Sequence, residues 1–136
     1  MLHIEGFNCS ESVLLAIVSE WGISSELIPR LATGFGGGMG RQGYVCGALA
    51  GGIMAIGIRY GRDKGSDVLA RDKSYATVRE LFSRFRTEFR TIECSELTGC
   101  DLTTPEGVAK HNLAYQDTCA KYIARVVELV LELTNQ

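Results

Sequence analysis

Five cysteines are the residues of this sequence whose chemistry is most informative: Cys9, Cys46, Cys94, Cys100 and Cys119. A cysteine thiolate can act as a nucleophile, a redox group or a metal ligand. The number is odd, and the N-terminal sequence MLHIEGFNCSES lacks the basic and apolar regions of a signal peptide. We therefore predict no framework of structural disulfides, and expect a cytoplasmic protein with mostly reduced thiols.

Two of these cysteines are predicted to lie at helix N-termini. In NCSESVLLAIVSEWG, Asn8 is a suitable N-cap and Glu11 completes a capping box, which places Cys9 at the first helical position. Cys46 lies in the first turn of a helix predicted over residues 44–60. Unpaired N–H groups and the helix dipole stabilise a thiolate there, so we expect thiol pKa values below about 8.5 for Cys9 and Cys46.

The other three cysteines have different settings. Cys94 and Cys100 are six residues apart on a short irregular segment, so both could face a common site. Cys119 shares an apolar helical stripe with Ile123 and Val126, a pattern that favours a packing role.

A zinc module is not indicated, because the sequence has no C-x-x-C pair. A metal or iron–sulfur site assembled from distant cysteines would need about four converging thiolates or imidazoles. His3 and His111 are available, but we expect both to lie on the surface.

Glycine is concentrated around Cys46, with eleven glycines in residues 34–61. GMGRQG at 38–43 matches a dinucleotide-binding motif by letter, but no strand precedes it and no βαβ units follow. Consecutive glycines instead permit sharp turns with positive φ. In the following helix, Gly47 and Gly51 lie four residues apart, a spacing that serves either close helix packing or access to a bound cofactor.

The elements that must position these residues are helices. Helical periodicity predicts segments over about 9–21, 24–33 and 44–60, a long helix capped by Ser66, a short turn near 93–98, and a last helix beginning at Thr104 and Pro105. No strand with alternating pattern is found. We predict an all-α fold, a compact bundle of about five to six helices forming one domain over residues 1–136, in which a glycine-rich loop precedes a buried helix of small residues.

The charge distribution and the hydropathy indicate which classes of binding partner to expect. The net charge is -2, with nine of the fourteen Lys and Arg in residues 59–90 and an acidic excess in 93–136, which predicts faces that neutralise each other within the fold or across a dimer. We expect no nucleic-acid binding and, because the longest uncharged segment has only 17 residues, no membrane insertion. The amphipathic faces of the two long helices suggest a homodimer.

Several segments together resemble a known family. FNCSESVLLA, GFGGGMGRQGYVCGALAGGIMAIGIRYG, CSELTGCDL and a cysteine in the apolar final helix are similar to the redox-active proteins labelled C-GCAxxG-C-C. The motif is Cys46-Gly47-Ala48-Leu49-Ala50-Gly51, and the chain has Val45, where the label places glycine, before the cysteine. The resemblance implies redox activity or cofactor binding through Cys9, Cys46, Cys94 and Cys119, with Cys100 outside the defining four.

Three functions follow as hypotheses. The first is thiol-based redox chemistry, in which Cys9 or Cys46 attacks, another cysteine resolves the mixed disulfide, and a redox protein is the partner. The second is a protein that binds an iron–sulfur cluster, haem or another metal through the same four cysteines. The third is a helical binding or scaffold protein whose cysteines only pack.

Overall fold

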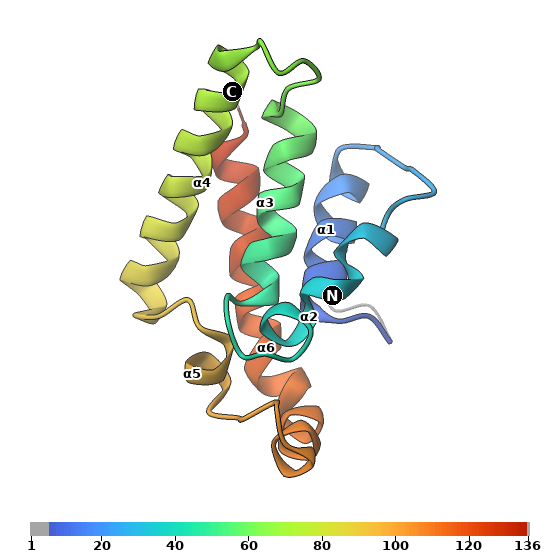
Figure 1. The fold of residues 1–136 in the computed structure, drawn as a ribbon, viewed down its shortest axis with the longest axis vertical. Coiled ribbons are helices and arrows are strands. Elements are labelled where there is room, and N and C mark those ends of the chain that lie inside the picture. Colours follow the sequence, from blue (N-terminus) through green and yellow to red (C-terminus); the bar gives the residue numbers. More distant parts are fainter. Residues whose placement is uncertain (1–5, 136) are drawn as a thin grey trace.

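Four long helices form the body of the protein, and shorter elements connect them. A computed structural model describes residues 6–135. Figure 1 shows α3 (Gly47–Tyr60), α4 (Val68–Phe89) and α6 (Pro105–Leu133) side by side, with α1 (Cys9–Glu20) next to α3. The 3₁₀ helix η1 (Arg30–Phe35) and the short helices α2 (Gly36–Met39) and α5 (Cys94–Thr98) complete the order. The described residues contain no strand, so the predicted all-α bundle is confirmed.

The core lies where α3 meets α1, α4 and α6. The apolar stripes predicted for the two long helices are buried here, so they stabilise one chain by removing apolar surface from water. The prediction that these faces form a homodimer stays a prediction. The fully buried side chains of the core include Val13, Leu14, Ile17, Leu49, Ile56, Leu81, Phe85, Ile123, Val126 and Val130.

Local capping signals set most helix starts. The Asn8 side chain accepts a bond from Glu11 N (2.9 Å), and the Glu11 carboxylate accepts one from Asn8 N (3.0 Å), which confirms the capping box. Thr104 caps α6 and accepts a bond from Gly107 N (3.0 Å). The predicted cap of α4 was one residue early, because Asp67 accepts the bond from Ala70 N.

The predicted helix over 24–33 is wrong. Residues 26–29 form turns, and the 3₁₀ helix begins only at Arg30. Pro29 precedes that start and has no backbone N–H, so it cannot continue a helical hydrogen-bond pattern from the preceding residues.

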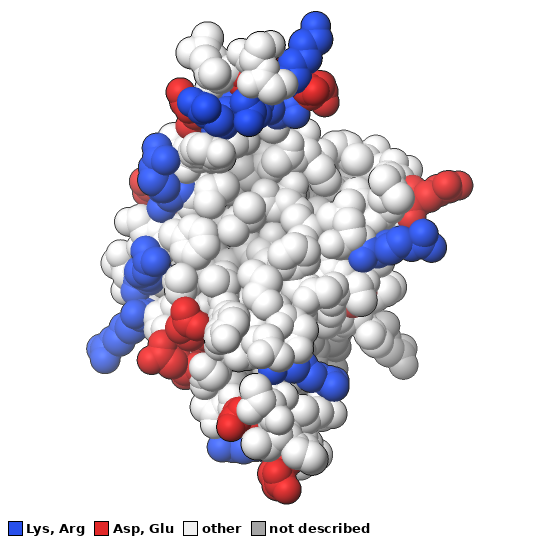
Figure 2. Space-filling view, viewed as in Figure 1, with Lys and Arg blue, Asp and Glu red and all other residues white. Residues whose placement is uncertain are grey.

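The basic and acidic regions neutralise each other partly within the chain. Figure 2 shows Lys and Arg around the α3–α4 connection and along α4. Across the α4–α6 contact, Arg125 Nε lies 2.8 Å from Glu88 Oε1, and Arg84 Nη1 lies 3.6 Å from Glu132 Oε2. Among the described residues, no helix combines the length and hydropathy needed to cross a membrane.

Candidate thiol site

All five cysteines are buried free thiols, with side chains only 3–6% exposed. Cys9 is the first residue of α1, Cys46 is the N-cap of α3, and Cys94 is the first residue of α5. Cys100 follows α5 and packs with Cys94 and Leu102, whereas Cys119 lies within α6. Figure 1 shows that α1 and α3 begin at the same end of the bundle, where α2 and α5 lie.

A short antiparallel pairing positions Cys46 and Cys94. Val45 and Glu93 form an isolated bridge, with Cys46 N donating to Ile92 O (2.7 Å) and Cys94 N donating to Tyr44 O (2.6 Å). Successive side chains of paired segments point to opposite faces, so both cysteines lie on the face away from Val45 and Glu93. This pairing also explains why α3 begins at Gly47 rather than at the predicted residue 44.

Cys9 is held against the first turn of α3 by the small residues of the CGAxxG motif. A Cβ added at Gly47 would overlap the Sγ of Cys9, and one added at Gly51 would overlap the backbone carbonyl of Ser10. The two glycines therefore allow the start of α1 to pack directly on α3. The prediction that Gly47 and Gly51 bind a cofactor stays a prediction, since in the structure both contact α1.

The thiols raise one another's pKa values, although Cys9 and Cys46 pack in the main core and Cys94 packs separately with Cys100. Cys9 is the cysteine whose charge most raises the pKa of Cys46, of Cys94 and of Cys119. Cys100 raises the pKa of Cys94 and Cys119 as well. Cys9 thus has the largest effect on the other three thiols, and the packing of Cys100 with Cys94 agrees with the expectation that these two could face a common site.

The predicted lowering of the pKa of Cys9 and Cys46 is wrong. Their positions at helix N-termini are confirmed, and backbone N–H groups do act on them: those of Gly37 and Ala48 lower the pKa of Cys9. Burial outweighs this effect and raises the pKa of both thiols. Burial also raises the pKa of Cys94 and of Cys119 to about 12. At neutral pH all four thiols hold their protons.

His111 is a partner that the sequence analysis missed. Its Nε2 lies 3.4 Å from Cys119 Sγ, and its ring is half-buried rather than on the surface as predicted. The first turns of α6, orange in Figure 1, lie at an angle to the rest of the helix. Burial and the nearby Arg41 charge lower the pKa of His111, so the ring is neutral near pH 7 and can accept a proton. His3 lies outside the described residues.

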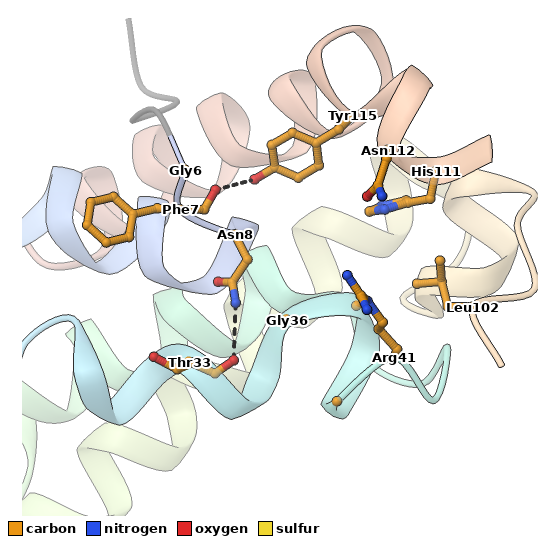
Figure 3. Close-up of a pocket in the computed structure, with 12 residues that line it drawn as sticks. Gly6, Phe7, Asn8, Thr33, Gly36, Arg41, Leu102, His111, Asn112 and Tyr115 are labelled. Atoms are coloured by element: carbon orange, nitrogen blue, oxygen red, sulfur yellow. Dashed lines mark hydrogen bonds between the residues drawn. The ribbon is translucent and has the colours of Figure 1, made fainter. Parts of the chain in front are cut away.

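A cleft of about 570 Å³ opens beside the cluster, and Figure 3 shows the residues that line it. Three of these touch thiols: His111 contacts Cys119, Gly37 directs its N–H at Cys9, and Leu102 packs with Cys94 and Cys100. The cysteines themselves do not line the cleft. Cys119 therefore lies behind the wall of the cleft at His111, and Cys94 and Cys100 lie behind it at Leu102.

The wall below the cleft is a left-handed turn in the glycine-rich segment. Residues 37–41 all have positive φ, from 60 to 72°. Two of them, Met39 and Arg41, are not glycine, and this conformation costs a side-chain-bearing residue about 1–2 kcal/mol. Gly38 packs against Cys94 and the backbone of Tyr44, where a Cβ would come within 2.6–2.7 Å of both. The turn thus fixes Cys94 from one side and presents Arg41 to the cleft.

The described residues contain no group of three or more His, Cys, Asp or Glu side chains arranged to hold a metal ion. The ligand role predicted for Cys9, Cys46, Cys94 and Cys119 in the metal, iron–sulfur or haem alternative stays a prediction. The redox roles predicted for the same four cysteines stay predictions. The structure adds His111, Arg41 and Cys100 to the residues of interest.

The structure is thus an all-α bundle with buried cysteines beside a cleft. The family described as "Putative redox-active protein (C_GCAxxG_C_C)" matches residues 7–133, and the chain belongs to this family. Membership supports a redox role in general terms and specifies no reaction. Searches of curated proteins and of solved structures found no match to the chain.

Proposed function

We propose that the protein exchanges two electrons with disulfide compounds through its clustered thiols, with Cys119 as the attacking thiol and Cys9 as the resolving thiol. The contact between Cys119 Sγ and His111 Nε2 carries this proposal. It joins a thiol to a neutral base that also lines the cleft. A disulfide in the cleft would lie beside His111, whose ring contacts Cys119.

The first step is a thiol–disulfide exchange. His111 Nε2 takes the Cys119 proton as Sγ attacks one sulfur of R–S–S–R, which forms a mixed disulfide and breaks the original S–S bond. The leaving thiolate takes the proton from the His111 imidazolium and departs as RSH. Because burial keeps Cys119 protonated at rest, the thiol is protected from adventitious oxidation until a substrate is present.

The second step forms a disulfide within the protein. Cys9 attacks Cys119 Sγ in the mixed disulfide, and the second RS⁻ leaves with the Cys9 proton. The protein loses two electrons and two protons, and the substrate gains them as two thiols. Cys9 suits this role because it begins α1, a helix that packs against the helix α6 that carries Cys119. Among the cysteines, its charge also raises the pKa of Cys119 most.

A redox titration tests the proposal. The reduced protein would be equilibrated in dithiothreitol buffers of graded potential, alkylated, and analysed by peptide mass spectrometry. We expect a single two-electron transition and a Cys9–Cys119 disulfide. Cys9→Ser and Cys119→Ser would each abolish it. Five thiols that stay reduced over the whole range, or an unchanged transition in both variants, would overturn the proposal.

Serine variants of all four cysteines test the alternative hypothesis that the protein binds a metal or another cofactor. Protein purified without oxygen would be assayed for bound metal and for visible absorption. A stoichiometric metal or chromophore that disappears in the Cys9, Cys46, Cys94 and Cys119 variants would replace thiol exchange as the function. Metal-free, colourless protein that still completes the two-electron transition would support the exchange reaction.

A further inference from the structure

The cleft has the size and polarity of a small-molecule site. Its volume of about 570 Å³ lies within the range of about 300–1,000 Å³ that is typical of ligand pockets. Its lining combines apolar surface from Phe7, Leu102 and Tyr115 with polar groups from α1, η1 and α6. Among the described residues, Arg41 is the only Lys, Arg, Asp or Glu that lines the cleft, and the Glu11 carboxylate lies behind the lining, where it accepts hydrogen bonds from Asn8 N and Thr33 Oγ1. The guanidinium at the cleft surface therefore favours an anion beside it.

Arg41 is positioned toward the cleft by its backbone. The residue ends the left-handed turn with a φ of 66°, and its side-chain stem crosses over Gly37, where a Cβ would approach Arg41 Cγ to 2.8 Å. Figure 3 shows the guanidinium pointing toward His111 and Asn112 across the cleft. Within residues 6–135, no carboxylate forms an ion pair with Arg41, so its planar set of N–H donors is available to a carboxylate ligand.

We infer that the cleft binds a small anionic disulfide and that Arg41 pairs with its carboxylate, which places the S–S bond beside His111 and Cys119. This inference rests on the proposed function and names its substrate class. It also couples binding to reaction. A carboxylate that pairs with Arg41 offsets the positive charge that lowers the pKa of His111, so the base becomes stronger when substrate is present.

Three disulfides of similar size and different charge test this directly. They are 3,3′-dithiodipropionate, which is anionic, 2-hydroxyethyl disulfide, which is neutral, and cystamine, which is cationic. The measurement is the rate at which each oxidises the reduced protein, followed by quenching and mass spectrometry. We expect dithiodipropionate to react about 10-fold to 100-fold faster than cystamine, the range for a hydrogen bond between charged groups. Added salt should reduce that ratio.

Two arginine variants test whether the preference for the anionic disulfide depends on Arg41. Arg41→Gln should slow the reaction with dithiodipropionate by a similar factor, and so reduce the preference of the protein for dithiodipropionate over 2-hydroxyethyl disulfide. The matched control is Arg90→Gln, because Arg90 is also exposed, also has positive φ (73°), and lies at the end of α4 outside the cleft. Equal rates for all three disulfides, with no change in Arg41→Gln, would overturn this inference while the exchange function stands. No reaction with any of them would instead overturn the proposed function.

Binding can be measured without reaction. Suberate has the length of dithiodipropionate with two methylene groups in place of the disulfide. In a heteronuclear NMR titration we expect saturable shifts at His111, Asn112 and the 37–41 turn in the wild-type protein, and their loss in Arg41→Gln. Shifts that are absent in the wild type, or unchanged by the substitution, would overturn the assignment of Arg41 as the anion partner.

Discussion

Cys9 and Cys119 illustrate two environments for a thiol in one protein. Cys9 begins a helix and receives backbone N–H groups from α3 and the glycine-rich turn. Cys119 lies inside a helix and has a histidine at 3.4 Å. The sequence predicted that Cys9 is reactive and that Cys119 is a packing residue. In the structure, Cys119 has the base and the adjacent cleft, whereas Cys9 is enclosed between α1 and α3.

This comparison shows that burial, more than position at a helix N-terminus, determines whether these thiols are protonated. A helix N-terminus stabilises a negative charge by about 0.3–1 kcal/mol, and by about 2 kcal/mol in favourable sites. Full burial can shift a pKa by about 3–5 units, at roughly 1.4 kcal/mol per unit. The larger effect wins at Cys9 and Cys46. A buried thiol then needs a base close by, and His111 lies in such a position beside Cys119.

The largest expected effect on stability comes from disrupting the seam between α1 and α3, the close contact that Gly47 and Gly51 allow. Gly51→Leu places a side chain against the backbone of Ser10, which cannot move without displacing α1. We expect a loss of more than about 3 kcal/mol in the free energy of unfolding, at or above the usual range for overpacked cores. Urea denaturation of the reduced protein measures it.

Gly57→Leu is the matched control for this substitution. Gly57 lies in the same helix, but a Cβ there meets nothing within 4 Å. The same gain in helix propensity should leave stability unchanged or raise it by up to about 1 kcal/mol. Equal losses in the two variants would show that the seam is not what holds Cys9 in place.

The second-largest effect is expected on the exchange rate at Cys119. His111→Gln removes the base and should slow exchange at Cys119 by about 100-fold, the lower end for general base catalysis. Cys9 alkylation in the same protein should not change. Cys9 alkylation can be measured in both wild-type and Cys119→Ser backgrounds, because it does not require the thiol at position 119. A His111→Gln substitution that changes Cys9 alkylation in both backgrounds would assign His111 a structural role only.

These contrasts show what sequence reasoning can predict here. Helix caps at Asn8 and Thr104 and the apolar stripe of α6 are local patterns, and they predicted the elements correctly. The grouping of the cysteines followed only from the family resemblance. The His111–Cys119 contact depends on side-chain packing across a bent helix, and the positive φ of Arg41 is not a preference of arginine. The sign of the thiol pKa shifts required burial, which no local pattern contains.

The third effect is a pH dependence of stability. Cys94 and Cys119 have a folded pKa of about 12, against 9.0 for an ordinary thiol. Between these values the unfolded chain loses protons that the folded chain keeps, so stability falls as pH rises above about 9. Each thiol contributes at most about 1.4 kcal/mol per pH unit. For His111 the folded pKa is lowered, so its contribution is lost as pH falls below 6.5.

Unfolding at several pH values under reducing conditions separates these contributions. In Cys94→Ser and Cys119→Ser the alkaline slope should be smaller, and in His111→Gln the acidic slope should be smaller. An alkaline slope that is the same in wild type and in both serine variants would mean that these thiols are not protected from solvent in the folded protein.

The smallest effect is expected at Cys100, the cysteine outside the family motif. Its Sγ donates a long bond to Thr98 O (3.5 Å), and a serine hydroxyl can donate to the same carbonyl. Cys100→Ser should therefore cost no more than about 1 kcal/mol and keep the two-electron transition. This variant is informative because Cys100 lies near both Cys94 and Cys119, where a second resolving thiol would have to lie. If Cys100→Ser lost the disulfide while Cys9→Ser kept it, Cys100 rather than Cys9 would be the resolving thiol.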